Sequence, residues 1–384
     1  MKILIFASNI GKTAPGIVFE KLINGLSQMH QIDVVTESMD SKFELEKVNE
    51  IIEIKKNYLH PRIFKLFISW LNISPVDWYW SKRAIKNLVK KNKSNYDLIF
   101  CFISFHHYAS LLAGIRYSEK IGRKLAVYSV DAIPAPLGWS KDNGYYKSVK
   151  RMMELLLSKA DFFFSANQQM LDYQLTVFKP KASIITGVIY NPNDGKLKNI
   201  EHDKNVSNTF LYTGGIYGVR KPIYILQAFS RLLNDYPNCI LEFVGSHIPE
   251  KYLTEFNGYK EGKVIIHPHV RDLHPFYQRA KALIDIDGDI PNDVFLSSKI
   301  VNYLEVNRII ISETGPDSPS RNIFRDIPSI LQCDHNSESL YKAMRAVVEG
   351  KASIDFADRK YVLELFSICN VVKGINEKLN AGFK

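Results

Sequence analysis

The chain has 384 residues, of which 46% are hydrophobic and 23% are charged, and its formal net charge is +10 at pH 7. This composition is typical of a soluble globular protein, and the length exceeds one ordinary hydrophobic core, so we expect two domains. The four cysteines lie far apart without a CxxC pair, which argues against a zinc site or a disulfide framework and fits a reducing cytoplasm. No segment reaches the roughly 18 uncharged apolar residues of a membrane span, and residues 1–6 are too short for a signal peptide.

The positive charge is concentrated in the first half of the chain. Residues 1–200 contain 28 Lys and Arg against 17 Asp and Glu, whereas residues 201–384 contain 22 against 23. Ten of these basic residues lie within residues 54–93, where Asp77 is the only acid. Such a local excess indicates a basic surface and not a general adaptation for solubility.

Apolar runs alternate with helical patterns along the first half, which predicts a Rossmann-like domain over residues 1–195. The loop Gly11-x4-Gly16 after the first strand is not the GxGxxG dinucleotide motif. The continuous apolar run 97–104 indicates a parallel strand that is buried on both faces. Strands are expected at residues 2–8, 32–36, 51–54, 97–104, 125–130, 161–166 and 183–188, and helices at residues 17–26 and about 145–159.

Residues 58–93 combine basic and aromatic side chains, and they include three of the four tryptophans. One interpretation is a pair of core helices covered by solvated lysines. The other, which we favour, is a surface that contacts anionic lipid, because tryptophan beside lysine and arginine is typical of membrane interfaces. The residues assigned to this membrane or acceptor patch are Trp78, Trp80, Lys82, Arg83, Lys86 and Lys90.

Polar side chains follow two neighbouring strands of the first half. His106 and His107 come directly after strand 97–104, and Asp131 comes directly after strand 125–130. The carboxyl ends of parallel strands are where α/β folds bind ligands. We predict that Asp131 orients an acceptor hydroxyl or a donor sugar, and that the two histidines line the acceptor side. The alternatives are a turn aspartate and exposed polar histidines.

The second half repeats the alternation of strands and helices after a polar linker at residues 191–208. We predict a second Rossmann-like domain over residues 205–360. Residues 361–384 contain no strand pattern and are expected to form a C-terminal helix that packs back on the first domain. Strands are expected at residues 210–212, 241–244, 264–267, 283–287, 308–312 and 329–332.

The segment 210–246 reads as a strand, a glycine turn, a helix and a second strand, so its two strands should be parallel. Gly214 and Gly215 let backbone N–H groups approach a ligand, and Arg220 and Lys221 add positive charge near the start of the helix. A phosphate-bearing ligand fits this loop, although a glycine after a strand also makes an ordinary turn.

From this segment onward the sequence resembles glycosyltransferases of the GT-B fold, in particular family 4. The matching elements are Gly214-Gly215, Arg220-Lys221, Ala228-Phe229 and Val244-Gly245, followed by the block Ser297-Ser298-Lys299-x-x-Asn302-Tyr303-Leu304. The resemblance implies two Rossmann-like domains that face each other across a cleft. It also implies a nucleotide-sugar donor bound by the second domain and retention of anomeric configuration.

The resemblance assigns donor-binding roles residue by residue. Arg220 falls on the family's diphosphate-binding lysine and Lys221 on its neighbouring glycine, and Lys299 with Ser298 matches the Ser-Lys pair. Departures from the family are Gly215 in place of an arginine, Asn302 in place of the ribose-binding glutamate and Asp131 in place of a histidine. The donor-binding set is therefore Gly214, Gly215, Arg220, Lys221, Ser298, Lys299 and Asn302.

No metal and no cofactor are expected, because GT-B enzymes stabilise the leaving diphosphate with positive groups and N–H dipoles. The run Asp285-Ile286-Asp287-Gly288-Asp289 lacks the glycine and the glutamate of an EF-hand loop. We interpret its alternating aspartates as a solvated strand edge. His267 and His269 have no third metal ligand nearby in the sequence.

The function predicted from the sequence is sugar transfer from a nucleotide sugar to a lipid-linked or saccharide acceptor, in cell-surface polysaccharide biosynthesis. The expected location is the cytoplasm, at the inner face of the plasma membrane. A GT-B epimerase, a GT-B phosphorylase and a non-catalytic nucleotide-sugar binder are the alternatives. A nucleic-acid-binding protein is the remote alternative, supported by the high isoelectric point and thinly by the lysine and tryptophan patch. No nucleic-acid motif is present, so a nucleic-acid partner is not expected.

Overall fold

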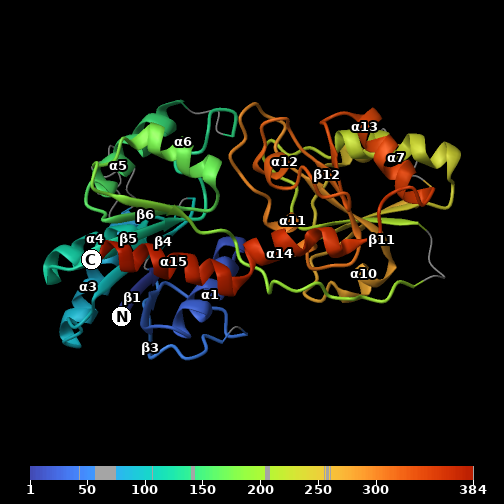
Figure 1. Cartoon of the computed structure of the whole chain (residues 1–384). Helices are drawn as coiled ribbons and strands as arrows, with labels where there is room; N and C mark the ends of the chain where they lie inside the picture. The colour runs from blue at the N-terminus through green and yellow to red at the C-terminus, as the bar shows by residue number, and fades with distance from the viewer. Residues whose placement is uncertain are drawn as a thin grey trace. The chain divides into compact units, whose positions relative to one another are not determined.

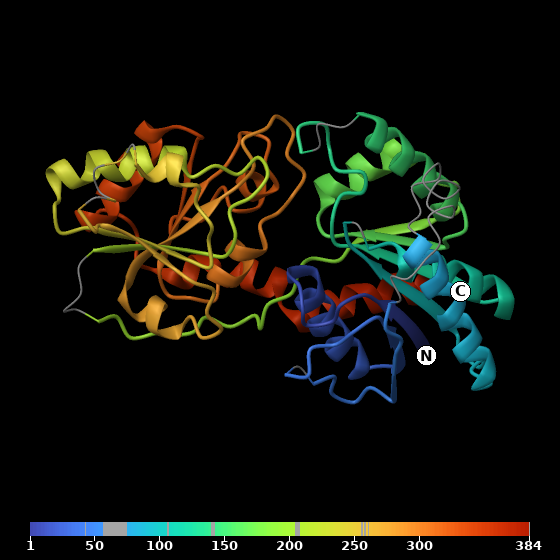
Figure 2. The same cartoon turned by 180° about the vertical axis from the view of Figure 1, so that it is seen from behind.

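The computed structural model of the chain contains two parallel β-sheets, each in its own unit (Figures 1 and 2). The structure describes residues 1–383 except 43, 57–74, 106, 140–142, 204–207, 255, 257, 258 and 260. The N-terminal unit consists of Met1–Pro192 together with Ile368–Lys384, and the C-terminal unit consists of Asn193–Ser367. The chain therefore passes from one unit to the other twice, after Pro192 and after Ser367.

The sheet of the N-terminal unit has seven strands in the order β3-β2-β1-β4-β5-β6-β7, and all neighbours are parallel. Each strand lies where the sequence predicts one, with ends that shift by one or two residues. The strands are β1 (Lys2–Ala7), β2 (Gln31–Thr36), β3 (Glu50–Glu53), β4 (Leu98–Ile103), β5 (Lys124–Ser129), β6 (Phe162–Ser165) and β7 (Ile185–Val188).

Helices cover both faces of this sheet because successive strand residues point to opposite faces. In β4, Ile99 and Cys101 contribute to one core, while Leu98, Phe100 and Phe102 contribute to the other. The first core is covered by α3 (Pro75–Lys90), α4 (Ala109–Ile121), α5 (Asn143–Leu157) and α6 (Gln168–Phe178), and the second by α1 (Ala14–Ser27) and α15 (Ile368–Gly382).

Helix α15 belongs to the core of the N-terminal unit although it follows the whole C-terminal unit in sequence (Figure 1). Its Val371, Val372, Ile375 and Leu379 are buried with residues of α1 and of the sheet. Gly25 of α1 permits this contact, since a Cβ atom there would lie 2.7 Å from Cγ2 of Val372. Residues 361–384 are thus two helices and not one, because Ser367 is extended between α14 (Lys360–Phe366) and α15.

The sheet of the C-terminal unit has six parallel strands in the order β10-β9-β8-β11-β12-β13. Helices α7 (Ile223–Asp235) and α13 (Ser337–Val348) lie side by side on one face (Figures 1 and 2). The strands are β8 (Thr209–Thr213), β9 (Ile240–Val244), β10 (Val264–His267), β11 (Ala280–Ile286), β12 (Ile309–Glu313) and β13 (Ile330–Cys333). The shorter helices are α8 (Glu250–Leu253), α10 (His274–Arg279), α11 (Ser298–Tyr303) and α12 (Pro319–Ile323).

A buried arginine joins three segments at the amino-terminal ends of β12 and β13. Arg359, in the 3₁₀ turn Phe356–Arg359, has no exposed surface. Its guanidinium donates hydrogen bonds to the carbonyl oxygens of Val306 (2.8 Å) and Ser329 (3.1 Å), and to that of Arg308. These acceptors lie just after α11 and just before β12 and β13, so one side chain fixes where the two strands begin.

The first part of the predicted linker makes hydrogen bonds and an ion pair with the rest of the C-terminal unit. Asn193 donates a hydrogen bond to the carbonyl oxygen of Val301 (3.2 Å), and Lys198 forms an ion pair with Glu305 (2.8 Å). The amide of Ile200 donates to Oδ1 of Asn307 at 3.0 Å. Residues 193–200 therefore pack along the C-terminal unit. Among the described residues, no helix combines the length and the low polarity that a membrane crossing needs.

Candidate functional site

The glycine loop after β8 brings a distant lysine close to the backbone. Gly214 has a φ of +91°, and a Cβ atom at this position would lie 3.0 Å from Cε of Lys299. The loop is held by the amide of Gly214, which donates to the carbonyl oxygen of Val244 (2.7 Å), and by Ser246, which donates to the carbonyl oxygen of Gly214 (2.6 Å). Glycine is required here both for the backbone angle and for the approach of Lys299.

Arg220, from the same loop, is buried beneath the surface. Its guanidinium donates a hydrogen bond to the hydroxyl of Tyr217 at 3.3 Å and lies 5.4 Å from the centre of that ring. Burial lowers the pKa of Arg220, whereas the neighbouring Tyr217 and Asp287 raise it. The net result is a pKa above its ordinary value. The next residue, Lys221, is exposed. The loop therefore presents one fixed buried cation and one exposed cation.

Lys299 lies near the start of α11, where the Ser297 hydroxyl caps the helix by accepting a hydrogen bond from the Lys299 amide (3.3 Å). Burial lowers the pKa of Lys299 to about 8, and the positive charge of Arg220 lowers it too, while Asp285 and Asp287 act in the opposite sense. The two cations are thus close enough to repel each other. An anion bound between them would relieve this repulsion, which is the property expected of a diphosphate site.

Two buried aspartates lie under these cations, and the interpretation of Asp285 and Asp287 as a solvated edge is wrong. Neither residue has any exposed surface. Ser297 donates a hydrogen bond to Asp285 (2.6 Å), and Ser318 donates one to Asp287 (2.8 Å). Burial, and then the charge of Asp287, raises the pKa of Asp285 to about 6. The strand β11 extends to Ile286, so Asp285 lies inside the sheet between two buried isoleucines.

The other predicted donor residues lie around this cluster. The carbonyl oxygen of Gly215 accepts a hydrogen bond from the Tyr212 hydroxyl (3.0 Å), and a Cβ atom at Gly215 would contact the Tyr217 ring at 3.4 Å. Ser298 is the first residue of α11, and Asn302 lies one turn after Lys299 and is exposed. We refer below to Gly214, Arg220 and Lys299 as the cation clamp.

In the N-terminal unit, Asp131 contacts the turn that follows β4. Its Oδ2 accepts a hydrogen bond from the amide of Phe105 at 2.9 Å, and its carbonyl oxygen accepts one from Ser129 at 2.6 Å. The amide of His107 donates to the carbonyl oxygen of Ser104 (3.0 Å), while its Nδ1 is buried without a partner within the part of the chain that the structure describes. His106 lies outside the described residues. Asp131 and His107 thus lie at the carboxyl edge of the sheet, where Asp131 shapes the loop.

Helix α3 carries the predicted membrane patch, and one residue of that patch is wrongly assigned. Trp80 is buried with Ala84 and Leu88 at helical spacing, and its indole N–H donates to the carbonyl oxygen of Ile54. It anchors the helix to the sheet and does not reach the surface. Trp78 is half-buried, and its ring is contacted by Lys82 at 3.6 Å and by Arg116 at 5.6 Å. The basic part of the patch is exposed and consists of Lys82, Arg83, Lys86 and Lys90.

The one acid within α3, Asp77, is withdrawn from the surface. Asp77 and Glu37 both form ion pairs with the buried Lys56, at 2.7 and 2.8 Å. The sequence gives no signal for this triad, because its members come from three separate segments. Its consequence is that Asp77 is paired with Lys56 and is not exposed beside the basic residues on α3.

A shallow groove lies beside the exposed basic residues, between the end of β3 and α3. Its volume is about 450 Å³, and Arg83 donates a hydrogen bond across it to the carbonyl oxygen of Lys55 (3.1 Å). The residues that line it are Glu53, Ile54, Lys55, Arg83 and Asn87. Residues 57–74, which include the other part of the basic and aromatic stretch, lie outside the described residues.

Groups of three or more His, Cys, Asp or Glu side chains that could hold a metal ion are not found in the described ranges. His267 of β10 lies 3.6 Å from Glu242 and packs edge-on against Phe276, with ring centres 5.0 Å apart. The contacts of His267 are thus with a carboxylate and a phenyl ring.

Comparison with known proteins gives a consistent fold. No family model matches the sequence, and no curated protein matches it. Among solved structures, HepE of Anabaena in complex with UDP and glucose is similar over 99% of both chains, with 13% identity and a TM-score of 0.69. The lipopolysaccharide outer core galactosyltransferase WaaB is similar over 99% of both chains, with 14% identity and a TM-score of 0.63. A Listeria monocytogenes structure assigned as a UDP-N-acetylglucosamine 2-epimerase covers 100% of this chain and 96% of its own, with 13% identity and a TM-score of 0.60.

The chain thus has the GT-B fold, as the sequence predicted. The identities lie far below the level at which activity follows from likeness, so the comparisons identify the fold and the site residues must carry the functional argument.

Proposed function

We propose that this chain is a glycosyltransferase that takes a sugar from a nucleotide-sugar donor. The observation that carries the proposal is the cation clamp, in which Arg220 and Lys299 converge beside Gly214 at the carboxyl ends of β8 and β11. Ligands of open α/β sheets bind at this edge. Solved structures of similar fold are complexes with UDP or UDP-glucose, which supports a nucleotide-sugar donor.

The clamp suits the chemistry of the leaving group. Cleavage of the bond between the sugar and the diphosphate leaves negative charge on the diphosphate, and two fixed cations stabilise that charge as it develops. Arg220 offers a planar fork of donors and Lys299 a compact point charge, so both the shape and the charge of a diphosphate are matched. In the proposed reaction the configuration at the sugar is retained and no metal is used, as the resemblance to family 4 implies.

A thermal-shift screen with UDP-, GDP- and CMP-sugars tests the donor proposal. Binding to the native state raises the free energy of unfolding by mass action, by about 2.7 kcal/mol at a ligand concentration of 100 times Kd. The melting temperature rises with it. We expect one nucleotide class to raise the melting temperature and the other two to leave it unchanged. If all three classes leave it unchanged, the donor proposal is rejected.

The proposed acceptor is lipid-linked or a saccharide, presented at the cytoplasmic face of the plasma membrane for cell-surface polysaccharide synthesis. The support for a membrane acceptor is the exposed basic face of α3, which the burial of Asp77 leaves without an acidic neighbour on that helix. Basic residues near an anionic bilayer contribute about 1 kcal/mol each.

Replacement of Lys82, Arg83, Lys86 and Lys90 by glutamine should therefore release the protein from anionic vesicles. Co-sedimentation with vesicles that contain phosphatidylserine measures this, and the bound fraction should fall at least tenfold, since four contacts of about 1 kcal/mol are lost. The matched control replaces three lysines and one arginine that are exposed in the C-terminal unit, Lys251, Arg325, Lys342 and Lys360. An equal loss in both variants would mean that net charge, and not this face, holds the protein on the vesicle.

A sugar-nucleotide epimerase is the second candidate, favoured by the likeness to the Listeria structure. The products separate the two functions. A transferase releases the nucleoside diphosphate when an acceptor is present, whereas an epimerase converts one nucleotide sugar into another and releases no diphosphate. Analysis of the bound nucleotide sugar after incubation with membranes therefore distinguishes them.

A further inference from the structure

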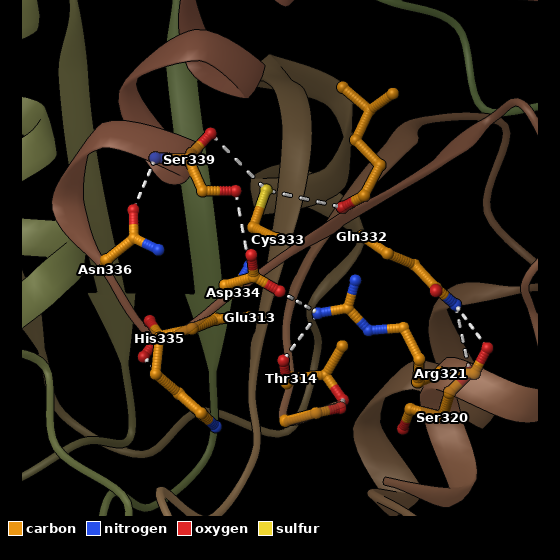
Figure 3. A network of polar contacts seen from close by, with 12 residues as sticks. Glu313, Thr314, Ser320, Arg321, Gln332, Cys333, Asp334, His335, Asn336 and Ser339 are labelled. Atoms are coloured by element: carbon orange, nitrogen blue, oxygen red, sulfur yellow. Dashed lines mark hydrogen bonds and ion pairs between the residues drawn. The ribbon is translucent and has the colours of Figure 1, made fainter. Parts of the chain in front are cut away.

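A carboxylate and an imidazole form a buried pair at the carboxyl ends of β12 and β13 (Figure 3). Glu313 is the last residue of β12, and His335 follows the end of β13. Nδ1 of His335 lies 2.9 Å from Oε1 of Glu313. The side chain of Glu313 is 1% exposed and that of His335 is 10% exposed. Neither residue is among the site residues predicted from the sequence.

Each partner of this pair keeps one polar atom without a hydrogen bond. Nε2 of His335 and Oε2 of Glu313 are both buried, and neither has a partner within the described part of the chain. A buried donor or acceptor that is left unsatisfied costs free energy, so each such atom in a native protein calls for an explanation. The hydrogen bond within the pair uses Nδ1 and Oε1, so it does not explain why Nε2 and Oε2 lack partners.

In the protonated form of His335, which the surrounding carboxylates favour, Nε2 is a donor. Burial lowers the pKa of His335, but Glu313, Asp289 and Asp287 raise it, so the net direction is upward. Burial raises the pKa of Glu313 to about 7, with His335 acting against this. With Nδ1–H donated to the carboxylate, the imidazolium form also carries a proton on Nε2.

The free nitrogen faces a position that lacks a side chain. A Cβ atom on Gly315 would lie 3.9 Å from Nε2 of His335 and 3.9 Å from the carbonyl oxygen of Ile290. The backbone of Gly315 is not in the left-handed region, so its conformation does not require glycine. We call the space between His335 Nε2, the Ile290 carbonyl oxygen and Gly315 the niche. It offers one donor and one acceptor, which is what a single hydroxyl group needs.

The surroundings of the niche favour an uncharged group. Asp287, Asp289 and Glu313 act on His335, and the Tyr224 hydroxyl contacts Asp289 at 3.5 Å. This excess of carboxylates disfavours a phosphate. The cation clamp, by contrast, favours one. The two neighbouring regions therefore suit the two halves of a sugar phosphate.

The niche and the clamp are linked through the sheet. β11 pairs with β12 so that Ile286 lies opposite Glu313, and the amide of Asp287 donates to the carbonyl oxygen of Glu313 at 2.9 Å. Asp287 in turn acts on both Arg220 and Lys299. Ile290 belongs to the segment 287–297, which has no helix or strand, so entry of a ligand group requires a shift of this segment and not of the sheet.

We propose that the niche receives a hydroxyl group of the donor sugar, with His335 as its donor and Glu313 as the residue that positions and charges His335. This inference rests on the proposed function. It names residues that discriminate between sugars, whereas the clamp binds the phosphate part of the nucleotide, which does not differ between sugars carried by the same nucleotide.

The test compares a nucleotide sugar with its nucleotide by calorimetry. The probes are the UDP-, GDP- or CMP-sugar that stabilises the protein most and the same nucleoside diphosphate or monophosphate without the sugar. For His335→Ala and Gly315→Val, we expect the affinity for the nucleotide sugar to fall about tenfold, the value of one hydrogen bond to a charged group. The affinity for the nucleotide alone should change by less than about twofold, since no contact to it is lost.

Gly315→Val keeps His335 and Glu313 intact and only fills the niche, so it separates loss of the pair from loss of the space. If both probes weaken equally, or if neither weakens, the inference is overturned. If the unaltered protein binds no nucleotide sugar of any class, the proposed function fails and this inference fails with it. Near-ultraviolet circular dichroism of each variant shows whether the fold is kept.

Glu313→Gln gives a readout that a merely structural role would not produce. Glutamine still accepts from Nδ1–H but no longer raises the pKa of His335, so Nε2 loses its proton at a lower pH. We expect the variant to bind the nucleotide sugar like the unaltered protein at pH 5.5 and more weakly at pH 8. An equal effect at both pH values would contradict the positioning role of Glu313.

Discussion

Replacement of both Arg220 and Lys299 by alanine should abolish binding of the nucleotide sugar and leave the chain folded. Each residue supplies charge-assisted hydrogen bonds to the diphosphate, worth about 1.5–3 kcal/mol apiece, so the double variant should bind at least about 100-fold more weakly. The fold should survive because the pKa of Asp285 is already raised to about 6. Without the two cations it rises further, and the carboxyl group accepts a proton instead of remaining a buried charge.

Calorimetry with the nucleotide sugar identified by thermal shift measures this effect. Lys342→Ala is the matched control, because Lys342 lies on α13 of the same unit, is exposed, and its described ion pair with Glu338 lies at the surface. Its affinity should equal that of the unaltered protein. Undiminished affinity in the double variant would show that the cation clamp is not the donor site.

Replacement of Arg359 by methionine should destabilise the C-terminal unit by about 3–5 kcal/mol, which is the range for breaking a buried charged network. Methionine fills a similar volume but donates no hydrogen bonds, so the carbonyl oxygens of Val306, Arg308 and Ser329 lose a buried donor. These carbonyls lie where β12 and β13 begin. Loss of their shared partner should therefore loosen the amino ends of these two strands, opposite to the end of β12 that carries Glu313.

Denaturant unfolding measures this loss, with Arg325→Met as the control. Arg325 is exposed and its described contact is a hydrogen bond to Asn322 at 3.1 Å, so the control should change stability by less than about 0.5 kcal/mol. If Arg359→Met unfolds at the same denaturant concentration as the control, the buried guanidinium does not hold the strands as described.

The strand positions were predictable because the signal for them is local. Runs such as residues 98–103 and 162–164 are apolar without interruption, as expected for strands covered on both faces, and each is bounded by polar or small residues. Alternation of such runs with amphipathic helices requires a parallel sheet. Two such series predict two Rossmann-like domains, the resemblance to family 4 implies the GT-B fold, and the similar structures confirm that fold.

The burial of individual polar residues was not predictable in the same way. The contacts of Asp285, Asp287 and Trp80 depend on segments that are distant in sequence, namely Ser297, Ser318 and Ile54. The local sequence of a strand that ends in alternating aspartates is the same whether these side chains are exposed or covered by another segment. One signal was available for Asp285, since its neighbours on both sides in β11 are isoleucines.

The residues of the candidate site also fall into those that the local sequence predicts and those that it does not. Gly214, Arg220 and Lys299 were found because a motif with fixed spacing marks them, and the structure brings them together. The pair of Glu313 and His335 has no motif, because its two members are joined only by the neighbouring positions of β12 and β13. Asp131, His107 and the basic face of α3 stay predictions for the acceptor side.

The position of α15 has a consequence for the order of events during translation. The ribosome synthesises residues 368–383 only after the whole of residues 193–367, yet these late residues cover one face of the sheet formed by residues 1–192. The nascent N-terminal unit must therefore wait with an uncovered apolar surface, whereas the C-terminal unit is contiguous and can fold as it emerges. The usual order, in which the first-made domain folds first, is reversed here, and the early half of the chain is the part most exposed to chaperones.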